Sequence, residues 1–234
     1  DYSLKVADDH NFKFLLGFNS ELNKYSTLNG SMSDLISDNV PTLNTATLNP
    51  LTSGQYQHWA TAGFFGRFNY NYKEKYLFEA NGRYDGSSRF PRDLRWNLFP
   101  SFSAGWNVAN EDFWKWDESI SVFKLRASYG ELGNQYTDNW YPFYPTLPFT
   151  VNGNTWLLNG QKQNYSSSPG LIASTLTWER ISSWNVGFDL QALDNRLGMV
   201  FELYQRNTYN MIGPAPELPV ILGTGVPRLN NAEM

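Results

Sequence analysis

The sequence lacks several residue types and patterns on which whole classes of protein depend. Its 234 residues include no cysteine, which excludes disulfides, iron–sulfur clusters, zinc knuckles and cysteine nucleophiles. The only histidines are His10 and His58, too few for an obvious metal cluster, so we expect neither metal nor cofactor. Lys and Arg number 18 against 22 Asp and Glu, a formal net charge of −4. Nucleic-acid binding usually requires a basic surface, so we expect no nucleic-acid partner.

Long apolar runs are also absent. No segment approaches the roughly 18 apolar residues of a membrane-spanning helix, so average hydropathy alone suggests a soluble chain. Hydrophobic residues make up 41% and charged residues 17%, which excludes a disordered polyelectrolyte. The sequence opens at Asp1 without an initiator methionine or signal peptide and stops at Met234 in a Gly/Pro-rich stretch. We therefore expect it to be a piece of a longer protein.

Catalytic groups are equally sparse. Adjacent carboxylates occur at positions 8–9, 111–112 and 117–118, but neighbouring side chains diverge in strands and turns, so they are poor glycosidase pairs. We interpret them as solvated turn charges. The segment Asp85–Arg89 has the composition of a loop tip rather than of a nucleophile site. The sequence therefore predicts that the chain is not an enzyme.

What the sequence does have is aromatic residues, 17% of the total, arranged with a period of two. Apolar and polar residues alternate strictly in seven segments, which is typical of strands with one apolar and one polar face. Residues Asp1–Val6 resemble the end of an eighth. We predict an all-β chain with strands near Phe12–Glu21, His58–Tyr72, Tyr76–Asp85, Trp96–Val108, Phe123–Tyr129, Ser183–Gln191 and Leu197–Arg206.

The links between these segments alternate between short and long. The short links are near residues 72–75, 110–119 and 193–196, and the long ones near residues 24–56, 86–95 and 134–177. An antiparallel up-and-down meander with turns on one rim and elaborated loops on the other produces this alternation. We expect the second short link to be one helical turn capped by Asn110. Pro100 falls inside the fourth segment, where we expect a bulge or an unpaired strand end.

Segment length and aromatic placement favour a membrane barrel over a soluble sheet. A tilted membrane strand needs about 9–11 residues, whereas soluble strands are commonly about 5–6 residues long. Aromatic residues fall near segment ends, as in the girdles at lipid–water boundaries; these are Tyr70, Tyr72, Tyr76, Tyr84, Trp96, Trp106 and Trp184. We therefore predict that residues 1–234 form part of one transmembrane β-barrel domain.

The alternation also assigns side chains to two faces. The predicted lipid-facing residues are Phe64, Phe68, Phe78, Phe102, Trp106, Phe188 and Phe201. The opposite face carries charges of both signs, which would line the barrel lumen and pair across neighbouring strands. These are Arg67, Glu79, Arg83, Asp85, Lys124, Arg126, Asp189, Glu202 and Arg206.

The third long link is rich in aromatic residues set among Asn, Gly, Pro and Ser. Aromatic rings with amide partners suit sugar or peptide ligands, because the rings stack on apolar faces while the amides form hydrogen bonds. The candidate substrate contacts are Trp140, Tyr141, Tyr144 and Trp156. The alternative is that these rings pack on one another or on a partner.

Five segments together resemble the SusC/RagA family, the TonB-linked outer-membrane transporters of Bacteroidetes. They are Tyr72–Phe90 (YKEKYLFEANGRYDGSSRF), Asn97–Trp106 (NLFPSFSAGW), Lys124–Gly130 (KLRASYG), Thr177–Glu179 (TWE) and Asn185–Asp189 (NVGFD). The resemblance runs from about His10 to Asn210 and identifies a C-terminal barrel fragment.

The resemblance implies a barrel of about 22 strands, an N-terminal plug, a TonB-box through which TonB–ExbB–ExbD acts, and a SusD-like surface lipoprotein. It also implies glycans or peptides as substrates and an outer-membrane location. The plug, TonB-box and signal sequence are not in these residues, and about seven strands cannot close such a barrel. The alternatives are a soluble carbohydrate-binding β-sandwich and a passive porin or adhesin barrel.

Overall fold

The computed structural model describes residues 1–7, 9–116, 119–151, 153, 156–215, 217, 219 and 225–234. Its main feature is one eight-stranded antiparallel sheet whose strands follow one another in chain order. The strands are β1 (Tyr2–Val6), β2 (His10–Leu35), β3 (Ala46–Tyr72), β4 (Tyr76–Ser87), β5 (Trp96–Asn107), β6 (Ile120–Asn134), β11 (Glu179–Ala192) and β12 (Leu197–Tyr209). The predicted all-β meander is confirmed, and β1 is the eighth strand.

The remaining elements are short. Three single 3-10 turns are η1 (Leu43–Thr45), η2 (Arg92–Leu94) and η3 (Val108–Asn110). The link between β6 and β11 carries the two-stranded pairs β7 (Phe149–Thr150) with β10 (Tyr165–Ser166) and β8 (Leu157–Leu158) with β9 (Gln161–Lys162). Near the end of the chain, β13 (Met211–Ile212) pairs with β14 (Asn230–Ala232).

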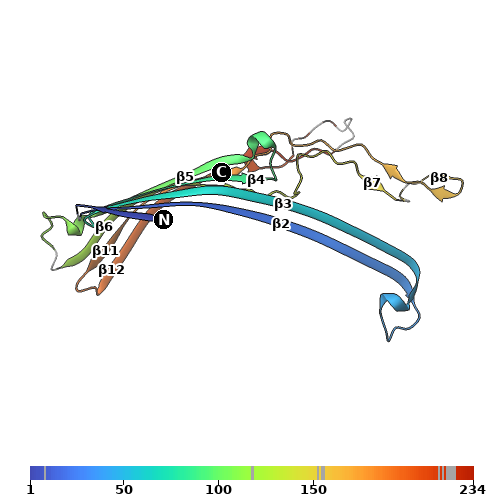
Figure 1. Ribbon diagram of the computed structural model, residues 1–234, viewed down its shortest axis with the longest axis horizontal. Helices are drawn as coiled ribbons and strands as arrows, with labels where there is room; N and C mark the ends of the chain where they lie inside the picture. Colours follow the sequence, from blue (N-terminus) through green and yellow to red (C-terminus); the bar gives the residue numbers. More distant parts are fainter. Residues whose placement is uncertain are drawn as a thin grey trace.

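The short links lie together at one end of the sheet and the long ones at the other (Figure 1). We call these the turn end and the loop end. The β3–β4 turn places Lys73 and Glu74 at φ of 49° and 57°, and the β11–β12 turn places Leu193, Asp194 and Asn195 at φ of 56°, 55° and 64°. In both turns non-glycine residues adopt the left-handed backbone conformation, which matches the right-handed twist of the strands that the turns join.

The first long link is not a loop. Strands β2 and β3 have 26 and 27 residues and pair from His10↔Tyr72 to Leu35↔Ala46, with one irregularity between Ser31 and Ser33. Figure 1 shows this hairpin extending far past β4. The prediction of a link over residues 24–56 was wrong, because both faces of the distal hairpin are solvated. A strand without a buried face needs no apolar residue at every second position, so the sequence shows no alternation there.

The expected helical turn lies earlier than predicted. It is η3, and Asn110 is its last residue rather than its cap. The Asn110 side chain instead donates to the backbone oxygen of Glu74 at 3.3 Å, joining this link to the neighbouring turn. Asn110 therefore binds a backbone carbonyl of the neighbouring turn instead of capping a helical turn of its own.

Pro100 lies inside β5 and is paired with β4 but not with β6, so the expected unpaired end is found on one side only. It lies opposite Gly82 of β4, but the ladder between β5 and β6 covers only Ser101 to Asn107. The proline therefore lies where β5 has a paired neighbour on one side only, a position that tolerates the missing N–H donor.

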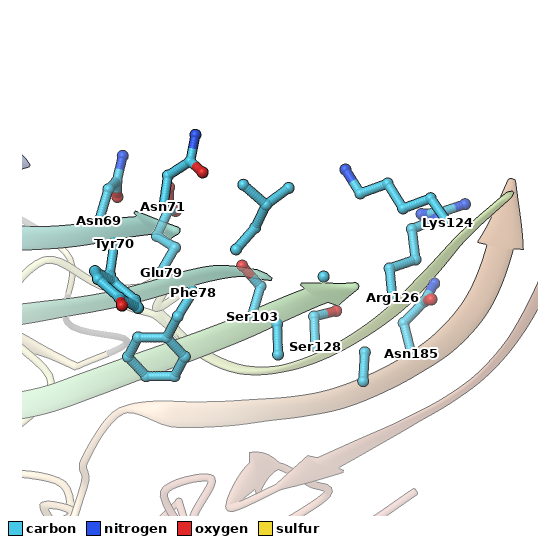
Figure 2. A pocket seen from close by; sticks show the side chains of 14 residues that line it. Asn69, Tyr70, Asn71, Phe78, Glu79, Ser103, Lys124, Arg126, Ser128 and Asn185 are labelled. Atoms are coloured by element: carbon cyan, nitrogen blue, oxygen red, sulfur yellow. The ribbon is translucent and has the colours of Figure 1, made fainter. Parts of the chain in front are cut away.

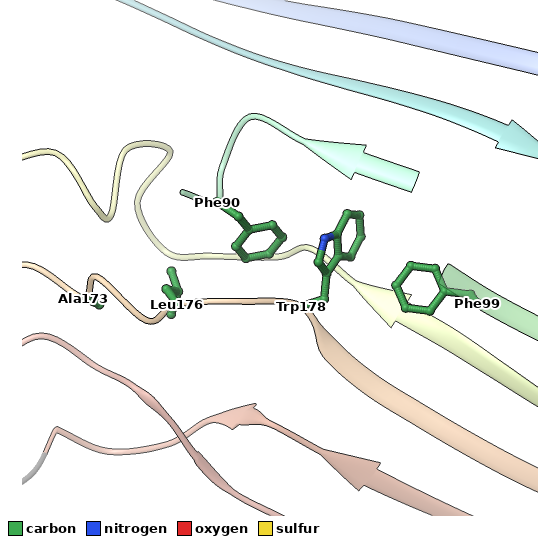
Figure 3. Close-up of a cluster of buried hydrophobic side chains, with 5 residues drawn as sticks. All are labelled: Phe90, Phe99, Ala173, Leu176 and Trp178. Carbon is green, nitrogen blue, oxygen red and sulfur yellow. The ribbon is translucent and has the colours of Figure 1, made fainter. Parts of the chain in front are cut away.

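Beyond that ladder, near the loop end, lies the buried hydrophobic cluster. Phe90, Phe99, Ala173, Leu176 and Trp178 pack together there (Figure 3). The Trp178 indole donates to the Arg95 backbone oxygen at 2.8 Å. This cluster joins the last residues before β11 to the β4–β5 link and to β5, so the end of the long loop rests on a fixed base.

Candidate functional site

The strand register sorts the side chains of the sheet onto two faces. Phe68 lies opposite Phe14 and Ala80, and Phe188 lies opposite Leu125 and Phe201. All seven predicted lipid-facing residues fall on this face, which we call the apolar face. All nine predicted lumen residues fall on the other, the polar face. Figure 2 shows Asn69 and Asn71 on one side of the sheet and Tyr70 and Phe78 on the other.

The apolar face is ordered but uncovered. Its rings pack across strands, with centroids 5.1 Å apart for Phe14 and Phe68 and 5.7 Å apart for Phe188 and Phe201. Phe64 nevertheless remains 56% exposed. Contiguous exposed apolar surface on this scale marks contact with a partner or a membrane.

Aromatic residues form a row at each end of this face. Tyr72, Tyr76 and Trp106 stack in turn near the turn end, with centroids 6.2 and 6.4 Å apart. Near the loop end Tyr84 stacks on Trp96 at 5.2 Å. Tyr76 and Tyr84 belong to the same strand, so the rows are separated by about 27 Å along it at ~3.4 Å per residue. That separation is on the order of the ~25 Å apolar band of a membrane barrel.

Charges on the polar face are mostly paired. Arg126 contacts Asp189 at 3.3 Å and also Glu202 of the next strand. Arg83 forms two 3.0 Å hydrogen bonds to the Asp85 carboxylate.

Arg67 follows the same pattern with Asn81 and Glu79, at 2.7 and 3.8 Å. Lys124 and Arg206 form no ion pair with any residue that the structure describes. Lys124, Arg126, Glu79 and Asn185 line a shallow hollow of about 560 Å³ (Figure 2). The face is therefore polar and of mixed sign, as a wall facing water requires.

Three of the four candidate substrate contacts lie close together. The Tyr141 ring meets the Tyr144 ring edge-on at 6.3 Å, and Trp140 precedes them in the chain. Trp156 belongs to the distal part of the loop and makes no ring contact within the described ranges. Tyr144 and Trp156 are exposed. Of the four candidates, Tyr144 and Trp156 are thus the exposed ones, and the four rings do not form a single platform.

Tyr141 has a structural partner that the sequence did not reveal. Strand β4 pairs with β3 only from Thr61 onward, so His58 is paired with Lys24 of β2 on one side but has no strand neighbour on the β4 side. The His58 N–H donates to the Tyr141 hydroxyl at 2.8 Å, and that hydroxyl donates to the His58 carbonyl at 2.9 Å. A side chain therefore completes the ladder and fixes the loop to the wall.

Arg89 lies beside this contact and was also missed. Its guanidinium sits over the rings of Trp59 and Trp140, 4.9 and 5.9 Å from their centroids, and donates to the Thr137 carbonyl at 3.4 Å. Burial lowers the pKa of Arg89. The interpretation of Asp85–Arg89 as a loop tip was wrong, because β4 continues to Ser87 and Arg89 is only 8% exposed. Polar composition cannot show that two indoles cover a segment.

The turn end carries a second polar cluster around Glu111. Its carboxylate accepts from the Trp106 indole at 2.9 Å and from Lys75 at 3.3 Å. Hydrogen bonds from Tyr76, Trp106 and Lys75 lower the pKa of Glu111. A hydrogen bond to Asp112 raises the pKa of Lys75.

Glu111 is therefore not a solvated turn charge, since its side chain is only 10% exposed. At the neighbouring turn Asp9 pairs with Lys73 at 3.1 Å. Asp112 has an exposed side chain, as predicted for a solvated turn charge. The remaining members of the adjacent carboxylate pairs, Asp8, Asp117 and Glu118, lie outside the described residues.

No group of three His, Asp or Glu side chains that could hold a metal occurs in the part of the chain that the structure covers. Among the described residues, no helix is long and apolar enough to cross a membrane.

A single curved sheet with an uncovered aromatic face and a charged opposite face is the architecture of a membrane β-barrel wall. The family model of TonB dependent receptor-like β-barrels matches residues 1–233. The chain belongs to this family of outer-membrane proteins, as the resemblance to SusC/RagA transporters predicted.

Curated relatives support the same assignment. The chain is 37% identical over 166 residues to TonB-dependent receptor P26 of Formosa agariphila and 34% identical over 158 residues to TonB-dependent receptor SusC of Bacteroides thetaiotaomicron. These matches cover 71% and 67% of the chain but 16% of each relative. The chain therefore spans about a sixth of their length.

Solved structures share the fold. The RagAB peptide transporter superposes with a TM-score of 0.84 at 22% identity, over 99% of this chain and 25% of that one. The RagAB peptide importer in its open-open state superposes with a TM-score of 0.83 at 23% identity, over 97% of this chain and 24% of that one. The outer-membrane location and the barrel-segment fold are thus confirmed.

Proposed function

We propose that these residues form part of the wall of an outer-membrane importer that takes up glycans or peptides. In this proposal a SusD-like lipoprotein captures the substrate outside, and TonB–ExbB–ExbD supplies energy through the plug. One observation carries the proposal: the wall has an uncovered apolar face, a charged polar face and an aromatic loop fixed to its loop end. Membership in the TonB-dependent family and the names of its relatives support it.

Within this function, the polar face contributes the lumen lining and the apolar face contacts lipid. The loop residues Tyr144 and Trp156 are the proposed substrate contacts because their rings are exposed. Tyr141 holds that loop to β3, and Trp140 packs against Tyr25 of β2 and Arg89, so both residues position the loop.

Uptake by the intact transporter tests the activity. Cells carrying it should import a labelled glycan or peptide, and deletion of TonB should abolish that uptake while leaving the protein in the outer membrane. Persistence of uptake without TonB would favour the passive-porin alternative instead. The β-sandwich alternative receives no support, because the described residues form only one large sheet.

Binding measurements test the contact residues separately. Y144A and W156A should each weaken substrate binding about tenfold, which is ~1.4 kcal/mol. Y2A provides the matched control, because Tyr2 is an exposed aromatic residue on β1, far from the loop in the sheet order. Equal affinities in all three variants would remove these residues from the site without affecting the uptake result.

A further inference from the structure

The link between η3 and β6 carries a compact aromatic segment, Phe113–Trp116, with the sequence Phe-Trp-Lys-Trp. The Trp114 ring stacks on Phe123 with centroids 5.7 Å apart and meets Trp116 edge-on at 5.1 Å. Phe123 in turn packs against Phe188 of the apolar face at 6.1 Å. The segment is therefore continuous with the surface that faces lipid.

Backbone hydrogen bonds hold this segment in place. The Trp114 N–H donates to the Glu111 carbonyl at 3.0 Å, and the Ile120 N–H donates to the Trp116 carbonyl at 2.7 Å. Even so, Phe113 and Trp116 remain 61% and 64% exposed. The four side chains line a hollow of about 270 Å³.

Two donors at this hollow lack acceptors. The Trp114 indole nitrogen is shielded from water and has no hydrogen-bond partner among the described residues. Lys115 makes no ion pair within the described ranges, whereas Lys73 and Lys75 on the same rim contact carboxylates at 3.1 and 2.9 Å. Exposed aromatic rings and a lysine ammonium without a carboxylate partner in the described ranges therefore lie together in this segment.

We propose that Phe113–Trp116 binds the headgroup of a phospholipid in the periplasmic leaflet of the outer membrane. The short turns of outer-membrane barrels face the periplasm. Indole rings lie at headgroup level with their N–H groups toward polar lipid atoms, and a lysine stem follows apolar surface while its ammonium reaches the phosphate. Because the segment is continuous with the apolar face, the acyl chains of a lipid cover Phe113 and Trp116. A free anion has no such chains, so the site fits a lipid better.

Native mass spectrometry of the intact transporter, titrated with the anionic lipid dioleoylphosphatidylglycerol, tests this site. K115Q should weaken lipid binding about fivefold, the effect of one basic residue at a lipid surface. K73Q is the matched control, because Lys73 lies on the same rim but is already paired with Asp9. Unchanged binding by K115Q, or an equal loss in K73Q, would overturn the proposal.

Two further measurements identify the ligand. Millimolar inorganic phosphate should fail to displace the lipid, and full displacement would show an anion site instead. In nanodiscs containing lipids brominated near the headgroup, W116F should show less quenched tryptophan fluorescence than the wild-type transporter. Equal quenching would mean that Trp116 does not contact lipid.

Discussion

Tyr141 makes the hydrogen bonds to β3 that a neighbouring strand would otherwise make. Its hydroxyl satisfies both backbone groups of His58, and Arg89 stacks against the adjacent Trp140. Backbone groups left without partners away from water are costly. The position of the long loop between β6 and β11 therefore depends on side chains that hold it to the strands beside it.

We expect Y141F to loosen this loop without unfolding the barrel. Loss of the hydroxyl removes two hydrogen bonds, each contributing about 0.5–1.5 kcal/mol. Hydrogen exchange of the His58 amide and of residues 137–144 should accelerate roughly tenfold or more. Y144F, whose hydroxyl forms no hydrogen bond within the described residues, is the control, and equal exchange in the two variants would contradict this role for Tyr141.

Glu111 should make the turn end sensitive to acid. Because folding lowers the pKa of Glu111 from its ordinary value of about 4.5, its contribution to stability is complete above that value. It is lost as the pH falls through the lower folded pKa. Melting temperatures of the intact transporter between pH 7 and pH 3 should show this loss, and E111Q should remove that part of the pH dependence. E21Q should retain the wild-type profile.

At the scale of elements, the two faces of a strand should respond oppositely to charge. F68R places a guanidinium on the apolar face and should destabilise the barrel by about 2–4 kcal/mol if it lies near the bilayer midplane. N69R places the same group on the polar face, one residue along β3, and should have a much smaller effect. Urea unfolding in lipid vesicles measures the difference; equal losses would refute the face assignment.

The distal β2–β3 hairpin should be dispensable for barrel assembly. At ~3.4 Å per residue, β2 is about 88 Å long, far more than a bilayer requires. Replacing residues 28–54 with Asn-Gly joins Thr27 to Gln55, which already face each other. We expect normal insertion, measured by heat-modifiable gel mobility. Failure to insert would show that the hairpin takes part in folding.

The molecule as a whole has unpaired edges. Within the described chain β1 pairs only with β2, and β12 only with β11. Such edges, together with the uncovered aromatic face, should make the isolated 234-residue chain aggregate in water and require detergent. Size-exclusion chromatography with light scattering checks this, and a soluble monomer would contradict the membrane assignment.

Sequence reasoning succeeded where one face of a strand meets a uniform environment. Alternation located β3 to β6, β11 and β12, because lipid on one side demands apolar residues at every second position. It failed in the distal hairpin, where water surrounds both faces, and at Arg89, whose polar neighbours suggested a loop tip. The first failure arises where neither face of a strand is buried, and the second where burial depends on segments distant in the chain.

The sequence by itself determined the strand order, the two faces and the family. Each of these follows from local alternation and contiguous motifs, which need no knowledge of distant contacts. Only the tertiary structure decided that Tyr141 completes the β3 ladder, that Arg89 lies between two indoles and that Glu111 is shielded at the turn end. Those contacts join residues 83, 51 and 5 positions apart, and even the shortest spans a turn. Their geometry is set by sheet register and loop packing rather than by any pattern along the chain.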